Sequence, residues 1–154
     1  MPQMRRSDTS LGEERELVEA YLGIMQLRIG PRLHWRIEAE PGLDDCRLPP
    51  ALLLSLVENA IKHGVEPSCK PAEVTVSLQS RGGRLQLRVA DTGVGLGAAD
   101  IGSSGVGLAN LRAQLALLHG DAAGLSLEEN EPQGFVATVH LPAVRDSPAP
   151  STEP

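Results

Sequence analysis

The sequence predicts a two-layer α/β sandwich, with a mixed sheet of about five strands and three helices on one face. Three observations lead to this fold class. A chain of 154 residues is long enough for one domain with one core. Apolar residues at helical spacing alternate with segments of period two, in the order helix, strand, helix, two strands, helix, two strands. The hydrophobic residues include only three aromatics (Tyr21, Trp35 and Phe135), so the predicted core is aliphatic.

The first helix is predicted to start at a capping box, in which Ser10 and Glu13 satisfy each other's backbone amides. Apolar residues at helical spacing continue from residue 11 to about residue 28, and Gly30-Pro31 ends the helix. Apolar and polar residues then alternate from Leu33 to Ala39, as in a strand with one buried face.

The second helix is predicted to start at Pro49-Pro50, because proline suits the first helical position, and to run to about His63. Alternating residues at 74–78 and 85–89 flank Gly82-Gly83, which is the pattern of a hairpin.

The rest of the domain is predicted to contain one helix and two strands. Six glycines between Gly93 and Gly107 predict an irregular stretch, followed by a helix from Leu108 to His119. Two strands at 125–127 and 135–141 then enclose a turn at 130–134.

We expect three segments: a polar leader (1–10), a folded domain (11–142) and a disordered Pro-rich tail (143–154). The net charge of −6 disfavours a nucleic-acid partner, because phosphate binding requires clustered basic residues. No apolar run approaches the roughly 20 residues needed to cross a bilayer. Cys46 and Cys69 lack the spacing of a zinc site or disulfide scaffold, so the expected compartment is the cytosol.

A first candidate motif lies on the second helix. Helical spacing would place Ser55, Asn59, Lys62 and His63 on one face. An amide oxygen suits Mg²⁺, and Lys and His can neutralise phosphate charge. The alternative is an ordinary amphipathic helix with solvated polar residues.

A second motif, Asp91-Thr92-Gly93-Val94-Gly95, follows the strand that ends near Asp91. A carboxylate there can accept a hydrogen bond from an exocyclic amine, and glycine lets a planar base approach the backbone. The alternative is a plain turn, in which Asp and Gly are common.

A third motif, Gly102 to Leu108, is a glycine loop that enters a helix. Free amides at a helix start bind phosphate oxygens. The loop lacks the Gly-Lys-Ser or Gly-Lys-Thr of a Walker A motif and the spacing of a dinucleotide fingerprint. The alternative is a flexible linker.

Together, these motifs resemble the N box and two glycine boxes of the GHKL ATPase superfamily, which includes histidine kinases, gyrase, Hsp90 and MutL. The matching strings are Glu58–His63, Asp91–Gly95 and Gly105–Leu108. Three longer strings resemble the LytS-like sensor histidine kinases more closely: Glu14–Leu22, Leu56–Gly64 and Gly107–Arg112. The resemblance covers about 11–142 and implies a Bergerat-type ATP-binding fold.

The resemblance also implies a set of site residues. Asn59 would ligate Mg²⁺ and form the catalytic set with Lys62 and His63, which would also lie near the ATP phosphates. The remaining ATP-binding residues would be Asp91, Gly93, Val94, Gly95, Ser104, Gly105, Val106, Gly107 and Leu108. Asp91 would bind the adenine amino group, Val94 and Leu108 would enclose the base, and 96–104 would form a lid over the nucleotide.

The implied function is that of a sensor-kinase catalytic domain, which transfers the γ-phosphoryl group of ATP to a His on a separate dimerisation domain. The family's Asn-Pro-His-Phe acceptor string is absent from this chain, and His34, His63, His119 and His140 are not placed to replace it. We therefore expect ATP binding without autophosphorylation. The expected partners are the phosphoacceptor domain and, indirectly, a response regulator, in the cytosolic part of a membrane-anchored sensor.

Three alternatives stay open. One is a stand-alone serine kinase of the anti-sigma-factor kind, and another is a nucleotide-binding domain kept for protein contacts. The third is an ATP-hydrolysing machine of the gyrase or Hsp90 kind, whose general base is a Glu one helical turn before the N-box Asn. Ser55 stands at that position here. Thr92 also differs from the Asn more usual among the relatives.

Overall fold

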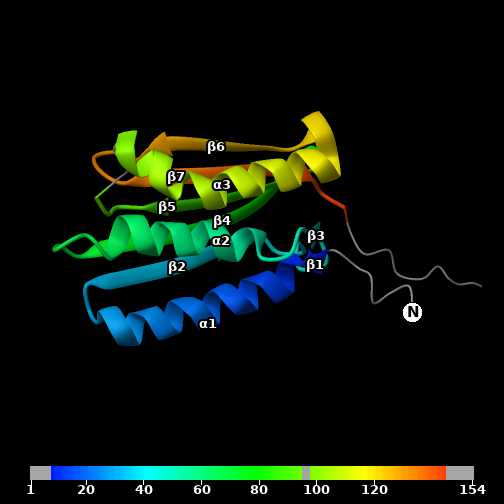
Figure 1. The fold of residues 1–154 in the computed structure, drawn as a ribbon. Helices are drawn as coiled ribbons and strands as arrows, with labels where there is room; N and C mark the ends of the chain where they lie inside the picture. The colour runs from blue at the N-terminus through cyan, green and yellow to red at the C-terminus, as the bar shows by residue number, and fades with distance from the viewer. Residues whose placement is uncertain (1–7, 95–97, 145–154) are drawn as a thin grey trace, which may run out of the picture.

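The structure, a computed structural model, describes residues 8–94 and 98–144, and for 98–107 the backbone alone. Its five-stranded sheet contains β2 (Leu33–Ala39), β4 (Ala72–Arg81), β5 (Arg84–Asp91), β6 (Gly124–Glu129) and β7 (Phe135–Pro142). Its α-helices are α1 (Leu11–Ile29), α2 (Leu52–Ala60) and α3 (Ala98–His119). The helices lie on one face of the sheet, with α2 between α1 and α3 (Figure 1). The predicted two-layer α/β sandwich is confirmed.

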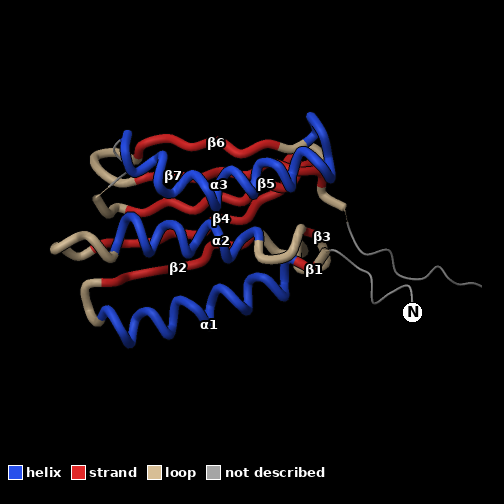
Figure 2. The backbone as a smooth tube through the Cα atoms, viewed as in Figure 1, coloured by secondary structure: helices blue, strands red, loops and turns tan. Residues whose placement is uncertain are grey.

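The sheet has the order β2-β4-β5-β7-β6 (Figure 2). β2 runs parallel to β4, and the other neighbours are antiparallel. The predicted hairpin is confirmed: Arg81 pairs with Arg84 around Gly82-Gly83, whose positive φ angles of 56° and 78° suit a two-residue turn. In the predicted last turn, the Asn130 amide donates to the Gly134 carbonyl at 3.0 Å.

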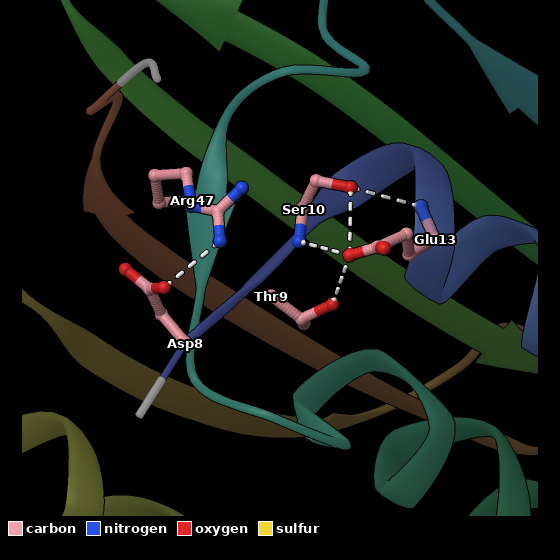
Figure 3. Close-up of polar contacts among 5 residues, drawn as sticks. All are labelled: Asp8, Thr9, Ser10, Glu13 and Arg47. Carbon is pink, nitrogen blue, oxygen red and sulfur yellow. Dashed lines mark hydrogen bonds and ion pairs between the residues drawn. The ribbon is translucent and has the colours of Figure 1, made fainter. Parts of the chain in front are cut away.

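α1 begins at the capping box that the sequence predicts. The Ser10 hydroxyl accepts the Glu13 amide at 3.1 Å, and the Ser10 amide donates to Glu13 Oε1 at 3.2 Å (Figure 3). The helix ends at Ile29, one residue beyond the predicted end, and Gly30 follows with φ 91°. The local sequence is therefore sufficient to place this helix.

A second, two-stranded sheet pairs β1 (Thr9–Ser10) with β3 (Arg47–Leu48). Asp8 also accepts a hydrogen bond from Arg47 at 2.9 Å (Figure 3). Two-residue strands carry no periodic pattern, so the sequence does not predict them. They correct one boundary: the last residues of the expected polar leader belong to the folded domain.

The second helix begins two residues later than predicted. Ala51 precedes it with left-handed backbone (φ 65°), so Leu52, not Pro50, is the first helical residue. Past Ala60 the helix widens into the π-helical turn η2 (Ile61–Val65), in which the Glu66 amide donates to the Ile61 carbonyl at 2.8 Å. π-turns inside helices often occur at functional sites.

The predicted irregular stretch before the third helix is wrong for residues 98–107. α3 begins at Ala98, so its backbone is helical through Gly102, Gly105 and Gly107. Once its packed C-terminal half is formed, adding a helical residue is much easier than starting a helix, even at a glycine. A short 3-10 turn, η3 (Gly120–Ala122), follows α3.

The core lies between the helices and the sheet, and it is aliphatic as predicted. Its largest fully buried side chains are leucines and one isoleucine from all three helices and the sheet, with Leu48 from β3: Leu11, Leu22, Leu33, Leu48, Leu52, Leu53, Leu56, Ile61, Leu78, Leu85, Leu87 and Leu115. Phe135 is buried, whereas Trp35 and Tyr21 are only partly buried against the core.

Candidate functional site

Asp91 is the centre of the candidate site. It is the last residue of β5, where it pairs with Val74 of β4 and Phe135 of β7, and it is only 2% exposed. Its Oδ1 accepts the Gly93 amide at 2.8 Å, and its backbone carbonyl accepts Asn130 Nδ2 at 2.9 Å. A buried carboxylate is therefore held at the end of the sheet, where the sequence predicts it.

Burial raises the pKa of the Asp91 carboxyl from its ordinary value of 3.8 to about 6, against the lowering effect of the Gly93 and Phe135 amides. The shift is large because water is excluded around the carboxylate. A buried carboxyl with a displaced pKa is typical of functional sites.

Three glycines pack tightly around Asp91. A Cβ at Gly64 would lie 2.5 Å from Asp91 Oδ1, and one at Gly93 would lie 2.0 Å from the Gly64 carbonyl oxygen. A Cβ at Gly134, where φ is +120°, would lie 1.9 Å from the Asp91 carbonyl oxygen. The end of η2, the start of the loop after β5 and the turn before β7 thus meet at one carboxylate, and only glycine leaves room for these approaches.

The loop after β5 is held from three sides. The Val94 amide donates to the Gly64 carbonyl at 3.0 Å, and Gln133 Nε2 donates to the Gly93 carbonyl at 2.7 Å. The Thr92 hydroxyl accepts the Glu73 amide at 2.8 Å. Thr92 stands where the relatives more often have Asn, and its hydroxyl is bound to the start of β4.

The N-box residues lie on α2 and the π-turn that extends it. Asn59 is part of α2 and is half-buried, Lys62 is exposed and His63 is half-buried within η2. α-Helical spacing ends at Ala60. The α-helical i+3 and i+4 spacing that predicts a face shared by Ser55, Lys62 and His63 therefore does not apply beyond Ala60. Gly64, one residue beyond His63, links this segment to Asp91.

Several predicted site residues lie outside the described part of the chain. Gly95 and the start of the expected lid fall within 95–97. For Ser104, Gly105, Val106 and Gly107 the structure describes the helical backbone of α3 and no side chain. Leu108 is buried (4% exposed) in the core, whereas Val94 is 43% exposed.

The sequence does not predict a role in the site for four residues around Asp91: Gly64, Gly134, Asn130 and Gln133. It predicts Gly64 as the stop of the second helix and the end of the Leu56–Gly64 string, and the other three as part of a turn. Glycine after a helix and Asn or Gly in a turn are common for local reasons. No signal in a single sequence distinguishes those reasons from a close approach to another segment.

The arrangement suits recognition of a polar planar group beside backbone. An ionised Asp91 accepts hydrogen bonds from an amine, next to the glycine backbone of the loop after β5. Asn59 offers one hard oxygen for Mg²⁺, an ion that usually takes few protein ligands besides substrate phosphates and water. In the described residues, no group of three or more His, Cys, Asp or Glu side chains could hold a metal.

None of the described helices is long and apolar enough to span a membrane.

Comparison with protein families matches residues 47–145 to the histidine kinase-, DNA gyrase B- and HSP90-like ATPases. The sensor histidine kinase YesM of Bacillus subtilis (strain 168) is 26% identical over 142 residues, which cover 90% of this chain and 25% of YesM. The sensor protein LytS of Staphylococcus haemolyticus is 31% identical over 150 residues, 90% of this chain and 26% of LytS. The chain therefore spans about a quarter of the length of these relatives.

Among solved structures, the catalytic domain of histidine kinase ThkA superimposes with a TM-score of 0.66 at 15% identity. The match covers 90% of this chain and 97% of that domain. ThkA in complex with the response regulator TrrA gives a TM-score of 0.65 at 17% identity, over 89% of this chain and 41% of ThkA. At these identities the likeness shows the fold.

Proposed function

Because this chain belongs to the family of histidine kinase-, DNA gyrase B- and HSP90-like ATPases, we propose that it is the ATP-binding catalytic domain of a sensor histidine kinase. In this proposal it binds Mg-ATP and transfers the γ-phosphoryl group to a histidine nitrogen on a separate phosphoacceptor domain. The bond from the γ-phosphorus to the ADP oxygen breaks as the bond to nitrogen forms, leaving ADP and phosphohistidine.

The observation that carries this proposal is the contact between Gly64 and Asp91. Gly64 directly follows the N box and ends the Leu56–Gly64 string, and the first glycine box begins at Asp91, 27 positions later in the chain. A Cβ on Gly64 would lie 2.5 Å from the Asp91 carboxylate, and this close approach of the two motifs supports a single site. In the proposed role, the Asp91 carboxylate accepts a hydrogen bond from the adenine amino group, and the Gly93–Val94 backbone lies beside the base.

The same proposal assigns the phosphate end of the nucleotide to α2 and η2. Asn59 would hold Mg²⁺, which would neutralise charge on the transferring phosphoryl group. Lys62 and His63 would lie near the phosphates, and the backbone around Ser104 to Gly107 would meet them at α3. Phosphoryl transfer depends mostly on positioning and on charge stabilisation, so these groups act by orienting the γ-phosphate toward the incoming histidine.

Slow hydrolysis of ATP belongs to the same proposal. One helical turn before Asn59, α2 carries Ser55, whose hydroxyl is a poor general base compared with a carboxylate. Glu58, the residue before Asn59, lies about 100° around the helix from it and so points in a different direction. Water at the γ-phosphate is therefore poorly activated. The phosphoryl group is transferred to the acceptor histidine faster than to water.

The proposed partners follow from the kinase role. Phosphotransfer needs a histidine-bearing dimerisation domain and then a response regulator, the kind of protein seen bound to ThkA. We also propose that the chain works as the cytosolic part of a membrane-anchored sensor.

Calorimetric titration with Mg-ATP tests the binding step. We expect one site in the unaltered chain and an affinity at least about tenfold weaker in Asp91→Asn, because a hydrogen bond to a charged acceptor is lost. Asp121→Asn, the same change at an exposed position in η3, is the matched control and should bind like the unaltered chain. Absence of Mg-ATP binding by the unaltered chain would refute the proposal.

A second experiment tests the acceptor. The chain, radiolabelled ATP and the phosphoacceptor helix segment of a LytS-like kinase are mixed, and acid-labile label is followed on each polypeptide. We expect label on the added histidine segment and none on this chain. Brisk steady-state hydrolysis without label on the acceptor would instead indicate an ATPase.

A further inference from the structure

The N-terminus of α2 has no cap from its own sequence. Its N-cap residue is Ala51, which has no side-chain hydrogen-bond group, and the first turn contains no acidic residue. The first amides of a helix have no partner inside the helix and need an acceptor from elsewhere. α2 also bears Asn59 near its other end, so the anchoring of its start concerns the proposed nucleotide site.

The acceptor is Glu14, which lies on α1. Glu14 Oε2 accepts the Ala51 amide at 3.0 Å, and Oε1 accepts the amides of Leu53 at 3.1 Å and Leu54 at 3.4 Å. The residue is only 1% exposed. A buried carboxylate is stabilised when several amides donate to it and when it faces the positive end of a helix dipole. One α1 side chain therefore replaces the missing cap of α2.

Glu14 is itself firmly placed. It follows Glu13, the capping-box residue that fixes the start of α1 (Figure 3). The Leu11 amide donates to the Cys46 carbonyl at 2.8 Å, and β1 pairs with β3, the last strand before α2. The first turns of the two helices are thus joined by a small sheet and by one carboxylate.

The far end of α2 is held as well. Through η2 it reaches Gly64, whose carbonyl accepts the Val94 amide at 3.0 Å beside Asp91. Asn59 lies between this contact and Ala51, about 12 Å along the helix from Ala51 at 1.5 Å per residue. The position of the Asn59 amide then depends on both anchors.

We propose that Glu14 is a positioning residue for the nucleotide site: by capping α2 from α1, it sets the place of Asn59 and hence the strength of the Mg²⁺-dependent contact with ATP. This inference rests on the proposed function. Asp91 itself is held by the pairing of β5 with β4 and β7, so recognition of the base depends much less on Glu14 than the Mg²⁺ contact does.

The test compares Glu14→Gln with Glu16→Gln, two substitutions in α1. In Glu14→Gln, one of the two accepting oxygens becomes a donor that faces backbone donors. Glu16→Gln makes the same chemical change at an exposed position of α1. Calorimetry measures the affinity of each variant for Mg-ATP and for ADP in EDTA. We expect Glu14→Gln to weaken Mg-ATP about tenfold, as loss of a supporting residue does at metal sites, and to change the affinity for metal-free ADP much less. Glu16→Gln should change neither affinity.

A double variant separates positioning from stability. Ala51→Gly relieves the left-handed backbone and should raise the thermal stability of Glu14→Gln without restoring the cap. We expect the double variant to regain part of its melting temperature but none of its Mg-ATP affinity. Recovery of both together, or an unchanged Mg-ATP affinity in folded Glu14→Gln, would overturn the inference.

Two further measurements keep the test decisive. Glu14→Asp retains the charge on a shorter side chain and takes the place of Glu14→Gln if that variant does not fold. It should bind Mg-ATP more weakly than the unaltered chain does. Hydrogen exchange at the Leu53 and Leu54 amides should speed up in the Glu14 variants and not in Glu16→Gln. No Mg-ATP binding by the unaltered chain would refute the proposed function itself, whereas normal binding with no difference between Glu14→Gln and Glu16→Gln would refute only this inference.

Discussion

Asp91 shows how one residue can serve a site at a cost to the fold. Its pKa of about 6, against an ordinary 3.8, means that the folded protein binds the proton more tightly than the unfolded chain does. The contribution of Asp91 to stability is therefore greatest below pH 3.8 and is lost as the pH rises through 6. At neutral pH, the ionised carboxylate is the form that accepts a hydrogen bond from an amine, but it is also the form that burial disfavours.

Removing this charge should stabilise the protein at neutral pH. The shift corresponds to about 3 kcal/mol, so we expect Asp91→Asn to raise the free energy of unfolding by up to that amount at pH 7.5 and by little near pH 4. Denaturant unfolding at both pH values measures the difference. The affinity of the unaltered chain for Mg-ATP should also fall as the pH drops through 6. A variant equally stable or less stable at pH 7.5 would contradict this account of the raised pKa.

Gly93 illustrates a purely steric demand. A Cβ there would lie 2.0 Å from the Gly64 carbonyl oxygen and 2.7 Å from its Cα, and backbone cannot move aside as a flexible side chain can. We expect Gly93→Ala to lower the free energy of unfolding by about 1–3 kcal/mol and to weaken Mg-ATP binding. Gly23→Ala in α1 is the matched control, because nothing lies within 4 Å of its Cβ position. That variant should gain about 0.5–1 kcal/mol, and a Gly93→Ala protein of unchanged stability would rule out the crowded contact.

Among the elements, α1 and α2 show opposite relations between sequence and structure. α1 begins at its own capping box and ends at Gly30, so neighbouring residues are enough to place it. α2 begins at Leu52 after a left-handed Ala51, and its cap comes from Glu14, 37 positions earlier than Ala51. The two prolines that predict an earlier start are local signals, and the observed start depends on a contact with another helix.

The left-handed conformation of Ala51 gives a prediction for this element. A side chain with a Cβ is strained at φ 65°, whereas glycine is not. We expect Ala51→Gly to raise the free energy of unfolding by about 0.5–1 kcal/mol. Ala20→Gly, at an exposed right-handed position in α1, should lower it by about 1 kcal/mol. Chemical denaturation of both variants measures the contrast, and a loss of stability in both would argue against strain at Ala51.

α3 shows that a glycine-rich segment can still be helical. Six glycines between Gly93 and Gly107 predict irregular backbone, yet Gly102, Gly105 and Gly107 lie within the helix. In a helix, glycine is less favourable than alanine by about 1 kcal/mol per residue. Packing of the adjoining part of the helix can offset this cost. The packed part contains Leu108, Leu111 and Leu115, and their helical spacing correctly predicts the second half of the element.

At the scale of the whole molecule, the two ends of the sandwich differ in role. Gly64, Asp91 and Gly134 meet beyond the end of α2, where β5 ends. The small β1–β3 sheet lies at the opposite end of the sandwich, beside the start of α1 (Figure 1). Glu14 and the nine residues of α2 connect these ends. If the proposed function holds, a change at the start of α1 therefore reaches the nucleotide site through α2.

Shortening the chain at its start tests the boundary of the domain. We expect removal of residues 1–10 to lower the free energy of unfolding by about 1–2 kcal/mol more than removal of 1–7. The longer deletion removes β1 and the Ser10 cap of α1, and a lost cap alone costs about 1 kcal/mol. Thermal unfolding of the two shortened chains measures the difference. Equal stability would mean that the folded domain begins at residue 11.

The succession of helices and strands, the aliphatic core, the capping box and the position of Asp91 at a strand end all follow from neighbouring residues. Each depends on a period, a turn or a cap a few positions long, so a single sequence contains the information. The meeting of Gly64 with Asp91, the capping of α2 by Glu14 and the helical backbone of 98–107 depend on segments far apart in the chain or on packing. A single sequence does not predict such contacts. The burial, the close approaches and the long-range hydrogen bonds form only when the helices pack on the sheet.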